Sequence, residues 1–166
     1  MEQFTGRVWV LGDDIDTDII IPTEYLALKT IEDMMQYGFS PLRPELAGQI
    51  REGDIIVAGK NFGCGSSREQ APEVIKALGI KCIFAKSFAR IFFRNSINNG
   101  LLLIEQPDLY YDIKEGDSIS VTLGQEVVYQ GRKYPIASLP DNLLEIINAG
   151  GLVKAMRKRN GLDERP

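Results

Sequence analysis

Short apolar runs alternate with helical periodicity through the middle of the chain. Residues 54–58 and 80–85 are typical of buried strands, and residues 72–78 between them have the spacing of a helix. A strand–helix–strand unit of this kind places its two strands parallel, with a right-handed crossover. A helix at residues 87–99 and a strand at residues 101–104 continue the pattern. We therefore predict a central parallel sheet with helices.

The N-terminal part of the chain contains two more expected strands. Residues 6–11 alternate and are partly β-branched, and the isoleucine run at residues 19–21, ended by Pro22, indicates a buried strand. The acidic residues 13–18 join the two strands. Residues 31–37 show weak helical periodicity.

The pattern changes near the C-terminus. Short alternating segments at residues 118–123, 125–130 and 133–136 indicate an antiparallel β meander. Helical patches at residues 139–149 and 152–158 follow it. The predicted fold class is therefore α/β, with a central parallel sheet, helices and an antiparallel meander.

Length and charge limit the function classes. A chain of 166 residues is expected to be one domain, residues 1–166, with a flexible basic tail from about residue 157. A net charge of -4 argues against nucleic-acid binding, which depends on clustered Lys and Arg. We expect no membrane association and a cytoplasmic location, because neither a membrane-length apolar stretch nor a secretory leader pattern occurs.

The scarce residue types exclude common chemistry. The chain has no histidine, which rules out Ser-His-Asp and Cys-His catalysis and the usual zinc sites within it. Its two cysteines, Cys64 and Cys82, lack metal-ligand spacing. Cys64 is expected to be a small residue between two glycines and Cys82 a core residue. Any chemistry then needs unusual residues or a partner.

The segment Gly63-Cys64-Gly65-Ser66-Ser67-Arg68 lies between an expected strand and an expected helix, where α/β sheets usually bind anions. Its glycines permit positive φ, its serines offer hydroxyl and N–H groups, and its arginine suits a carboxylate. An alternative is purely structural: Glu69 and Gln70 each stand three residues after a serine, as in a capping box. The segment matches neither the sequence pattern of a Walker loop nor that of a nucleophile elbow.

Three separated blocks carry a family resemblance. The segment from Gly63 to Glu69, followed by residues 85–95, resembles the swivelling β/β/α domain of the aconitase superfamily. Residues 12–18 with Ile20-Ile21-Pro22 resemble the start of the separate small subunits of 3-isopropylmalate dehydratase and homoaconitase. The resemblance covers nearly the whole chain, up to the C-terminal tail.

The resemblance implies a hydro-lyase that isomerises 2-isopropylmalate and 3-isopropylmalate by dehydration and rehydration in leucine biosynthesis. It implies that this chain binds no cofactor and works with a large subunit that carries a [4Fe-4S] cluster. In the family the first serine of this motif is the base that removes the substrate α-proton, and it maps onto Ser66. Ser67 and Arg68 map onto positions that bind a carboxylate of the dicarboxylate substrate. Gln70 departs from the family, which commonly has histidine there.

The resemblance also suggests which residues select the substrate. In the family the loop after the isoleucine-proline segment faces the variable group of the substrate, and here it contains Ala27 and Leu28. Homoaconitase-like members carry an arginine where Ala27 stands. A small apolar residue suits an isopropyl group and leaves an extra carboxylate unpaired. Two alternatives stay open: Ala27 and Leu28 could simply pack locally, and Lys29 could still reach a carboxylate.

Several alternatives stay open at this stage. The chain could instead be the small subunit of homoaconitase or of a methylmalate-type hydro-lyase, or a noncatalytic carboxylate-binding or assembly module. Self-association is a further possibility. Residues 13–18 are interpreted as a turn that borders the active-site face. Arg90 and Arg94, one helical turn apart, have no assigned role.

Overall fold

A seven-stranded sheet forms the centre of the molecule in a computed structural model that describes residues 3–161. The strands are β1 (Gln3–Val10), β2 (Ile55–Ala58), β3 (Cys82–Ala85), β4 (Leu102–Glu105), β5 (Ser118–Thr122), β6 (Glu126–Tyr129) and β7 (Arg132–Pro135). The helices are α1 (Thr17–Ile20), α2 (Ile31–Met35), α3 (Leu46–Gln49), α4 (Gln70–Leu78), α5 (Arg90–Asn98), α6 (Leu109–Asp112), α7 (Asp141–Ala149) and α8 (Leu152–Arg159), with a 3-10 turn at Thr23–Tyr25.

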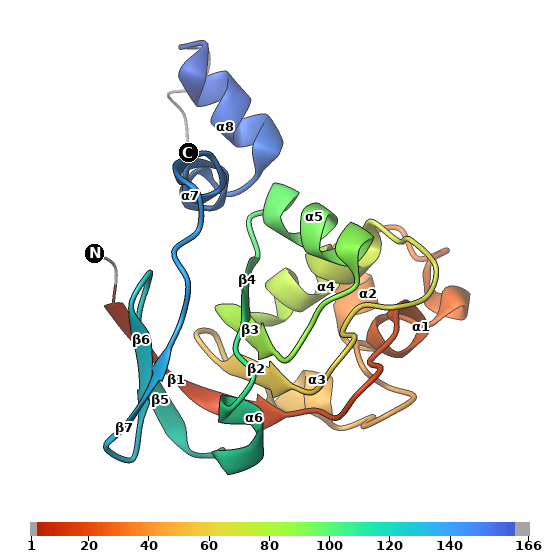
Figure 1. Ribbon diagram of the computed structural model, residues 1–166. Coiled ribbons are helices and arrows are strands. Elements are labelled where there is room, and N and C mark those ends of the chain that lie inside the picture. The colour runs from red at the N-terminus through yellow and green to blue at the C-terminus, as the bar shows by residue number, and fades with distance from the viewer. Residues whose placement is uncertain (1–2, 162–166) are drawn as a thin grey trace.

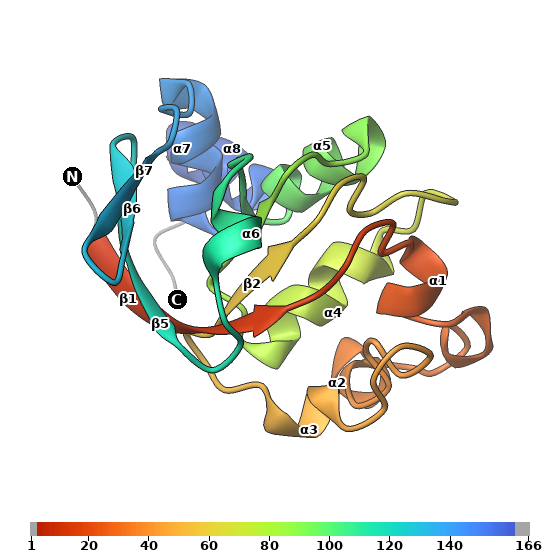
Figure 2. The same ribbon diagram turned by 60° about the horizontal axis from the view of Figure 1, so that its bottom comes forward.

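Strand β1 joins a parallel half of the sheet to an antiparallel half. The order is β4-β3-β2-β1-β5-β6-β7, in which β1 to β4 run parallel and β5 to β7 form the predicted meander. Gln106 just after β4 donates a hydrogen bond to the carbonyl of Pro135 at the end of β7, at 3.1 Å. The sheet is curled, and this side-chain hydrogen bond connects the ends of its two edge strands (Figures 1 and 2).

Alternation along the strands separates two hydrophobic clusters. Ile56 and Ala58 of β2 belong to a cluster that packs beneath helices α1 to α5, whereas Ile55 and Val57 face the cluster enclosed by the meander and α6. Successive side chains of a strand point to opposite faces, so a strand buried on both faces reads as a continuous apolar run. Helices α7 and α8 project from this body at the top of Figure 1.

The expected strand at residues 19–21 is wrong. This segment lies in and just after the short helix α1, whose N-cap residue Asp16 accepts a hydrogen bond from the Ile19 amide at 2.8 Å. Ile20 and Ile21 are buried, as an apolar run requires, but a side-chain cap from Asp16 favours a helical turn over a strand. The other expected strands and the parallel strand–helix–strand unit are confirmed.

The first residues of the predicted basic tail are helical. Residues 157–159 form the last turn of α8, where basic side chains interact favourably with the negative end of the helix. Residues 162–166 of the predicted tail lie outside the described residues. In the part of the chain that is described, no helix is both long enough and apolar enough to cross a membrane.

Candidate active site

Three loops meet at the carboxyl ends of the adjacent parallel strands β1, β2 and β3. The amide of Gly63, in the loop after β2, donates to the carbonyl of Ile15 in the loop after β1 at 2.7 Å. On its other side, Phe62 donates to the Ser87 carbonyl at 3.1 Å and accepts from Ala89 at 2.9 Å. The glycine loop, residues 63–68, is therefore held between two neighbouring loops at the edge where open α/β sheets bind ligands.

The two glycines of the glycine loop have the conformation that the sequence predicted. Gly63 has φ of 86° and Gly65 has φ of 93°, both in the left-handed region. A Cβ atom at Gly63 would lie only 2.1 Å from Cγ of Phe92 in α5. Gly63 is therefore required both by its backbone angle and by the close approach of α5.

The helix-cap alternative for the serines is wrong in this structure. Helix α4 begins at Gln70, its N-cap residue is Glu69, and no side chain caps it. Ser66 and Ser67 are exposed, and among residues 3–161 the hydroxyl of Ser66 has no hydrogen-bond partner. The backbone N–H groups of residues 65–68 donate to no acceptor within the same described range. The loop thus presents unsatisfied donors, as an anion-binding loop does.

A cavity of about 230 Å³ lies over the glycine loop. The loop residues Gly63, Gly65, Ser66, Ser67 and Arg68 line it together with Thr17 of α1 and with Ala89, Arg90, Ile91, Phe92 and Asn95 at the start of α5. Asn95 makes a long hydrogen bond of 3.5 Å to the hydroxyl of Ser67. The cavity brings the three predicted residues Ser66, Ser67 and Arg68 together.

Arg68 already holds three acceptors. Its guanidinium donates to the carbonyl of Ile21 and to the hydroxyl of Thr23, each at 2.8 Å, and it lies 2.6 Å from a carboxylate oxygen of Asp18. The Arg68 side chain is only 12% exposed, whereas that of Asp18 is 65% exposed. Arg68 therefore ties the glycine loop to α1 and to the segment after it, and the carboxylate it holds is one that water reaches.

The substrate-selection residues lie apart from this cavity. Ala27 is exposed and Leu28 is half-buried against the larger hydrophobic cluster, and neither lines the cavity. Their segment is connected to the glycine loop through the contacts of Arg68 with Ile21 and Thr23. Ala27 and Leu28 stay predictions for the site.

The two arginines of α5 differ in their surroundings. Arg90 is exposed and lines the cavity over the glycine loop, whereas Arg94 is exposed but lies outside it. A cation at the entrance of a site for a carboxylate is favourable, so Arg90 is the better placed of the two.

The acidic residues 13–18 hold the neighbouring loop rather than a metal ion. Asp13 accepts from the Lys60 amide at 2.8 Å and Asp14 accepts from the side chain of Asn61 at 3.0 Å. Within residues 3–161 no group of three or more His, Cys, Asp or Glu side chains could hold a metal ion. The interpretation of this segment as a turn beside the glycine loop fits these contacts.

Cys64 has the properties of an inert thiol. Partial burial raises the pKa of Cys64, and the nearby carboxylates of Asp16 and Asp14 raise it further. A thiol needs a lowered pKa to act as a nucleophile or to ligate a metal at neutral pH. The structure therefore favours a spacer role for Cys64 between the two glycines.

Sequence reasoning missed Thr17 and Asn95. Both line the cavity over the glycine loop and both bond to its serines, Thr17 through the Ser66 carbonyl at 2.8 Å. The Asp16-Thr17-Asp18 sequence contained a usable signal, because such residues initiate helices. The isoleucine run after it suggested a strand instead.

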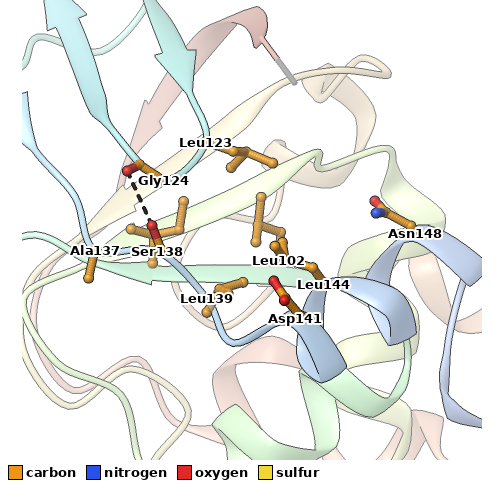
Figure 3. A pocket seen from close by; sticks show the side chains of 10 residues that line it. Leu102, Leu123, Gly124, Ala137, Ser138, Leu139, Asp141, Leu144 and Asn148 are labelled. Atoms are coloured by element: carbon orange, nitrogen blue, oxygen red, sulfur yellow. Dashed lines mark hydrogen bonds between the residues drawn. The ribbon is translucent and has the colours of Figure 1, made fainter. Parts of the chain in front are cut away.

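A second cavity, of about 340 Å³, lies under α7 and contains none of the predicted residues (Figure 3). Its lining is mainly apolar and comes from β4, the β5–β6 turn, residues 137–139 and α7. Ser138 there donates to the carbonyl of Gly124 at 3.3 Å. This cavity could enclose an apolar group, but it lacks the convergent hydrogen-bond donors of the glycine loop.

Comparison with known proteins agrees with the fold and its loop. The family model for the aconitase C-terminal domain matches residues 42–109, which include the glycine loop and α5. The curled mixed sheet with its helices and this match define the class of the molecule, an aconitase-type swivelling domain.

Curated relatives and a solved structure narrow the class. The chain is 78% identical over 162 residues to the 3-isopropylmalate dehydratase small subunit of Lachnospira eligens, covering 98% of this chain and 99% of the relative. It is 49% identical to 3-isopropylmalate dehydratase small subunit 1 of Archaeoglobus fulgidus, covering 93% and 99%. The crystal structure of 3-isopropylmalate dehydratase from Methanocaldococcus jannaschii matches with a TM-score of 0.91 at 41% identity, covering 97% of each chain. The chain belongs to the family of 3-isopropylmalate dehydratase small subunits.

Proposed function

We propose that this chain is the small subunit of a hydro-lyase that interconverts 2-isopropylmalate and 3-isopropylmalate by dehydration and rehydration, in leucine biosynthesis. One observation carries the proposal beyond family membership: the exposed hydroxyl of Ser66 stands in a loop whose amides are unsatisfied, beside a cationic side chain. This is a set of donors for negative charge rather than a helix cap.

Ser66 is the proposed base that removes the substrate proton next to a carboxylate. A serine hydroxyl is a poor base, so its alkoxide must be stabilised by nearby N–H groups and positive charge in a water-poor site. The amides of residues 65–68 and the guanidinium of Arg68 are the available stabilising groups. Because the loop is exposed in this chain, water exclusion requires another surface over it.

Ser67 and Arg68 are the proposed carboxylate-binding residues. A guanidinium can present two parallel N–H donors to a carboxylate, which an ammonium cannot. In the structure one of these interactions goes to the exposed Asp18 carboxylate. A substrate carboxylate would share the guanidinium with Asp18 or displace it, while the bonds to Ile21 and Thr23 keep Arg68 in place.

The proposed partner is a large subunit that carries a [4Fe-4S] cluster. The residues of this chain do not fit such a cluster, because the described part offers no metal-binding group and the chain has only two cysteines. On the partner, a cluster would supply a Lewis acid for the hydroxyl that leaves. The contribution of this chain is then the base and the carboxylate donors.

Isopropylmalate is preferred over a substrate with an added carboxylate because of the loop at Ala27 and Leu28. Neither side chain offers a charge to pair with a distal carboxylate, and an unpaired buried charge is costly. The exposure of Ala27 leaves it available to a ligand held between the two subunits.

Turnover by the reconstituted complex tests the assignment. Ser66→Ala in the complex with the large subunit is expected to reduce kcat by at least roughly 100-fold, the lower end of what a lost catalytic group costs. Ser138→Ala, at an exposed serine of the other cavity, is the matched control and should turn over normally. Normal turnover by Ser66→Ala with intact assembly would show that this chain only binds or assembles.

A further inference from the structure

Thr17 is the residue of α1 that contacts the backbone of the glycine loop at two points, once through its backbone and once through its side chain. Its amide donates to the carbonyl of Cys64 at 2.9 Å, and its hydroxyl donates to the carbonyl of Ser66 at 2.8 Å. Thr17 is only 3% exposed, so both bonds are shielded from water. Its position is fixed in turn by Asp16, which caps α1.

These two bonds determine where two other groups point. The carbonyl of Cys64 shares a peptide plane with the N–H of Gly65, and the carbonyl of Ser66 shares one with the N–H of Ser67. In a trans peptide the carbonyl and the N–H point in opposite directions, and the described chain has no cis peptide. Both carbonyls are held by Thr17, so both amides point away from α1, toward the exposed side of the loop.

Gly65 allows this arrangement to be compact. A Cβ atom at Gly65 would lie 3.3 Å from the Thr17 hydroxyl oxygen, closer than most side chains approach. Together with the bond from the Gly63 amide to the Ile15 carbonyl, three hydrogen bonds tie the loop to residues 15–17. The loop is therefore preorganised before any ligand binds.

We propose that Thr17 is a positioning residue for the reaction: its hydroxyl orients the peptide between Ser66 and Ser67 so that the Ser67 amide can stabilise the negative charge on Ser66. The inference rests on the proposed function of Ser66. Preorganised donors need no reorientation during the reaction, and most of the transition-state stabilisation at such sites comes from this preorganisation.

Loss of the hydroxyl alone tests the proposal. Thr17→Val keeps the shape and the backbone amide but removes the donor to Ser66, so that peptide can rotate. In the complex with the large subunit we expect kcat for 2-isopropylmalate to fall roughly 10- to 100-fold, which is less than the loss caused by removing an oxyanion donor itself. We expect KM to change less than about threefold. Thr17→Ser restores the hydroxyl and should keep kcat within about threefold of the parent.

A double variant separates positioning from packing. If Thr17 acts through Ser66, Thr17→Val should not reduce the turnover of the Ser66→Ala complex any further, because both changes abolish the same function. Additive losses, or equal losses for Thr17→Val and Thr17→Ser, would overturn the proposal. If Thr17→Val does not fold, Thr17→Ala takes its place in the same comparison.

The failure of this inference is distinguishable from failure of the proposed function. Normal turnover by Thr17→Val with strongly reduced turnover by Ser66→Ala overturns only the role of Thr17. Normal turnover by Ser66→Ala removes the proposed base, and the role of Thr17 falls with it.

Discussion

Gly63 offers a direct test of how the glycine loop is built, through the substitution Gly63→Ala. The added Cβ would lie 2.1 Å from Cγ of Phe92, with φ at 86°. A non-glycine residue in the left-handed region costs about 1–2 kcal/mol. Overpacking of a close contact adds about 1–3 kcal/mol. The expected loss of unfolding free energy is therefore about 2–5 kcal/mol.

Gly53→Ala is the matched control. Gly53 has φ of 93°, nearly that of Gly63, but a Cβ atom there would meet nothing within 4 Å. It should cost only the backbone term, about 1–2 kcal/mol. Subtracting one variant from the other isolates the steric contact with α5.

Urea unfolding of the isolated subunit, followed by circular dichroism, measures the difference. For a domain of this size each kcal/mol corresponds to roughly 2–4 °C in Tm, so thermal unfolding should rank the variants in the same order. If Gly63→Ala and Gly53→Ala agree within about 0.5 kcal/mol, the usual scatter of surface substitutions, the close approach of Phe92 is not a constraint.

Other predictions concern the site itself. Arg68→Lys should raise KM for isopropylmalate about tenfold or more with a smaller change in kcat, since an ammonium cannot replace the planar fork; an unchanged KM in steady-state assays would argue against carboxylate contact. Ala27→Arg should shift the ratio of kcat/KM values toward a substrate with an added carboxylate, and an unaltered ratio would remove Ala27 from the site. Iodoacetamide should alkylate Cys64 more slowly than it alkylates glutathione at neutral pH, because the raised pKa of Cys64 leaves less thiolate. The alkylation rate should keep rising with pH beyond the pH at which an ordinary thiol is fully ionised. Rapid labelling of Cys64 at pH 7 would contradict that pKa direction.

The parallel part of the sheet could be predicted from the sequence because its strands are buried on both faces. Apart from Asp54 and Lys81, residues 54–58 and 80–85 therefore read as apolar runs on either side of a helix. The run at residues 19–21 misled for the same reason: Ile20 and Ile21 are just as buried, and burial does not separate a strand from a short helix. The side-chain cap from Asp16 to the Ile19 amide makes this segment a helical turn.

The site was predictable only in part. Ser66, Ser67 and Arg68 are adjacent in the chain, so a local motif and its resemblance could find them. The bonds of Arg68 to Asp18 and of Thr17 to Ser66 join residues about fifty positions apart, and only the register of β1 beside β2 brings them together. Contacts of that range leave no periodic signal in a single sequence.

The most direct test of the central claim is isotope exchange at the substrate. When the complex of both subunits turns over 2-isopropylmalate in D₂O, mass spectrometry should find deuterium in recovered substrate and product, because a base removes and returns the proton next to a carboxylate. With Ser66→Ala in an equally assembled complex, deuterium incorporation should be reduced at least roughly 100-fold, in step with turnover. Incorporation at the parent rate would contradict Ser66 as the base.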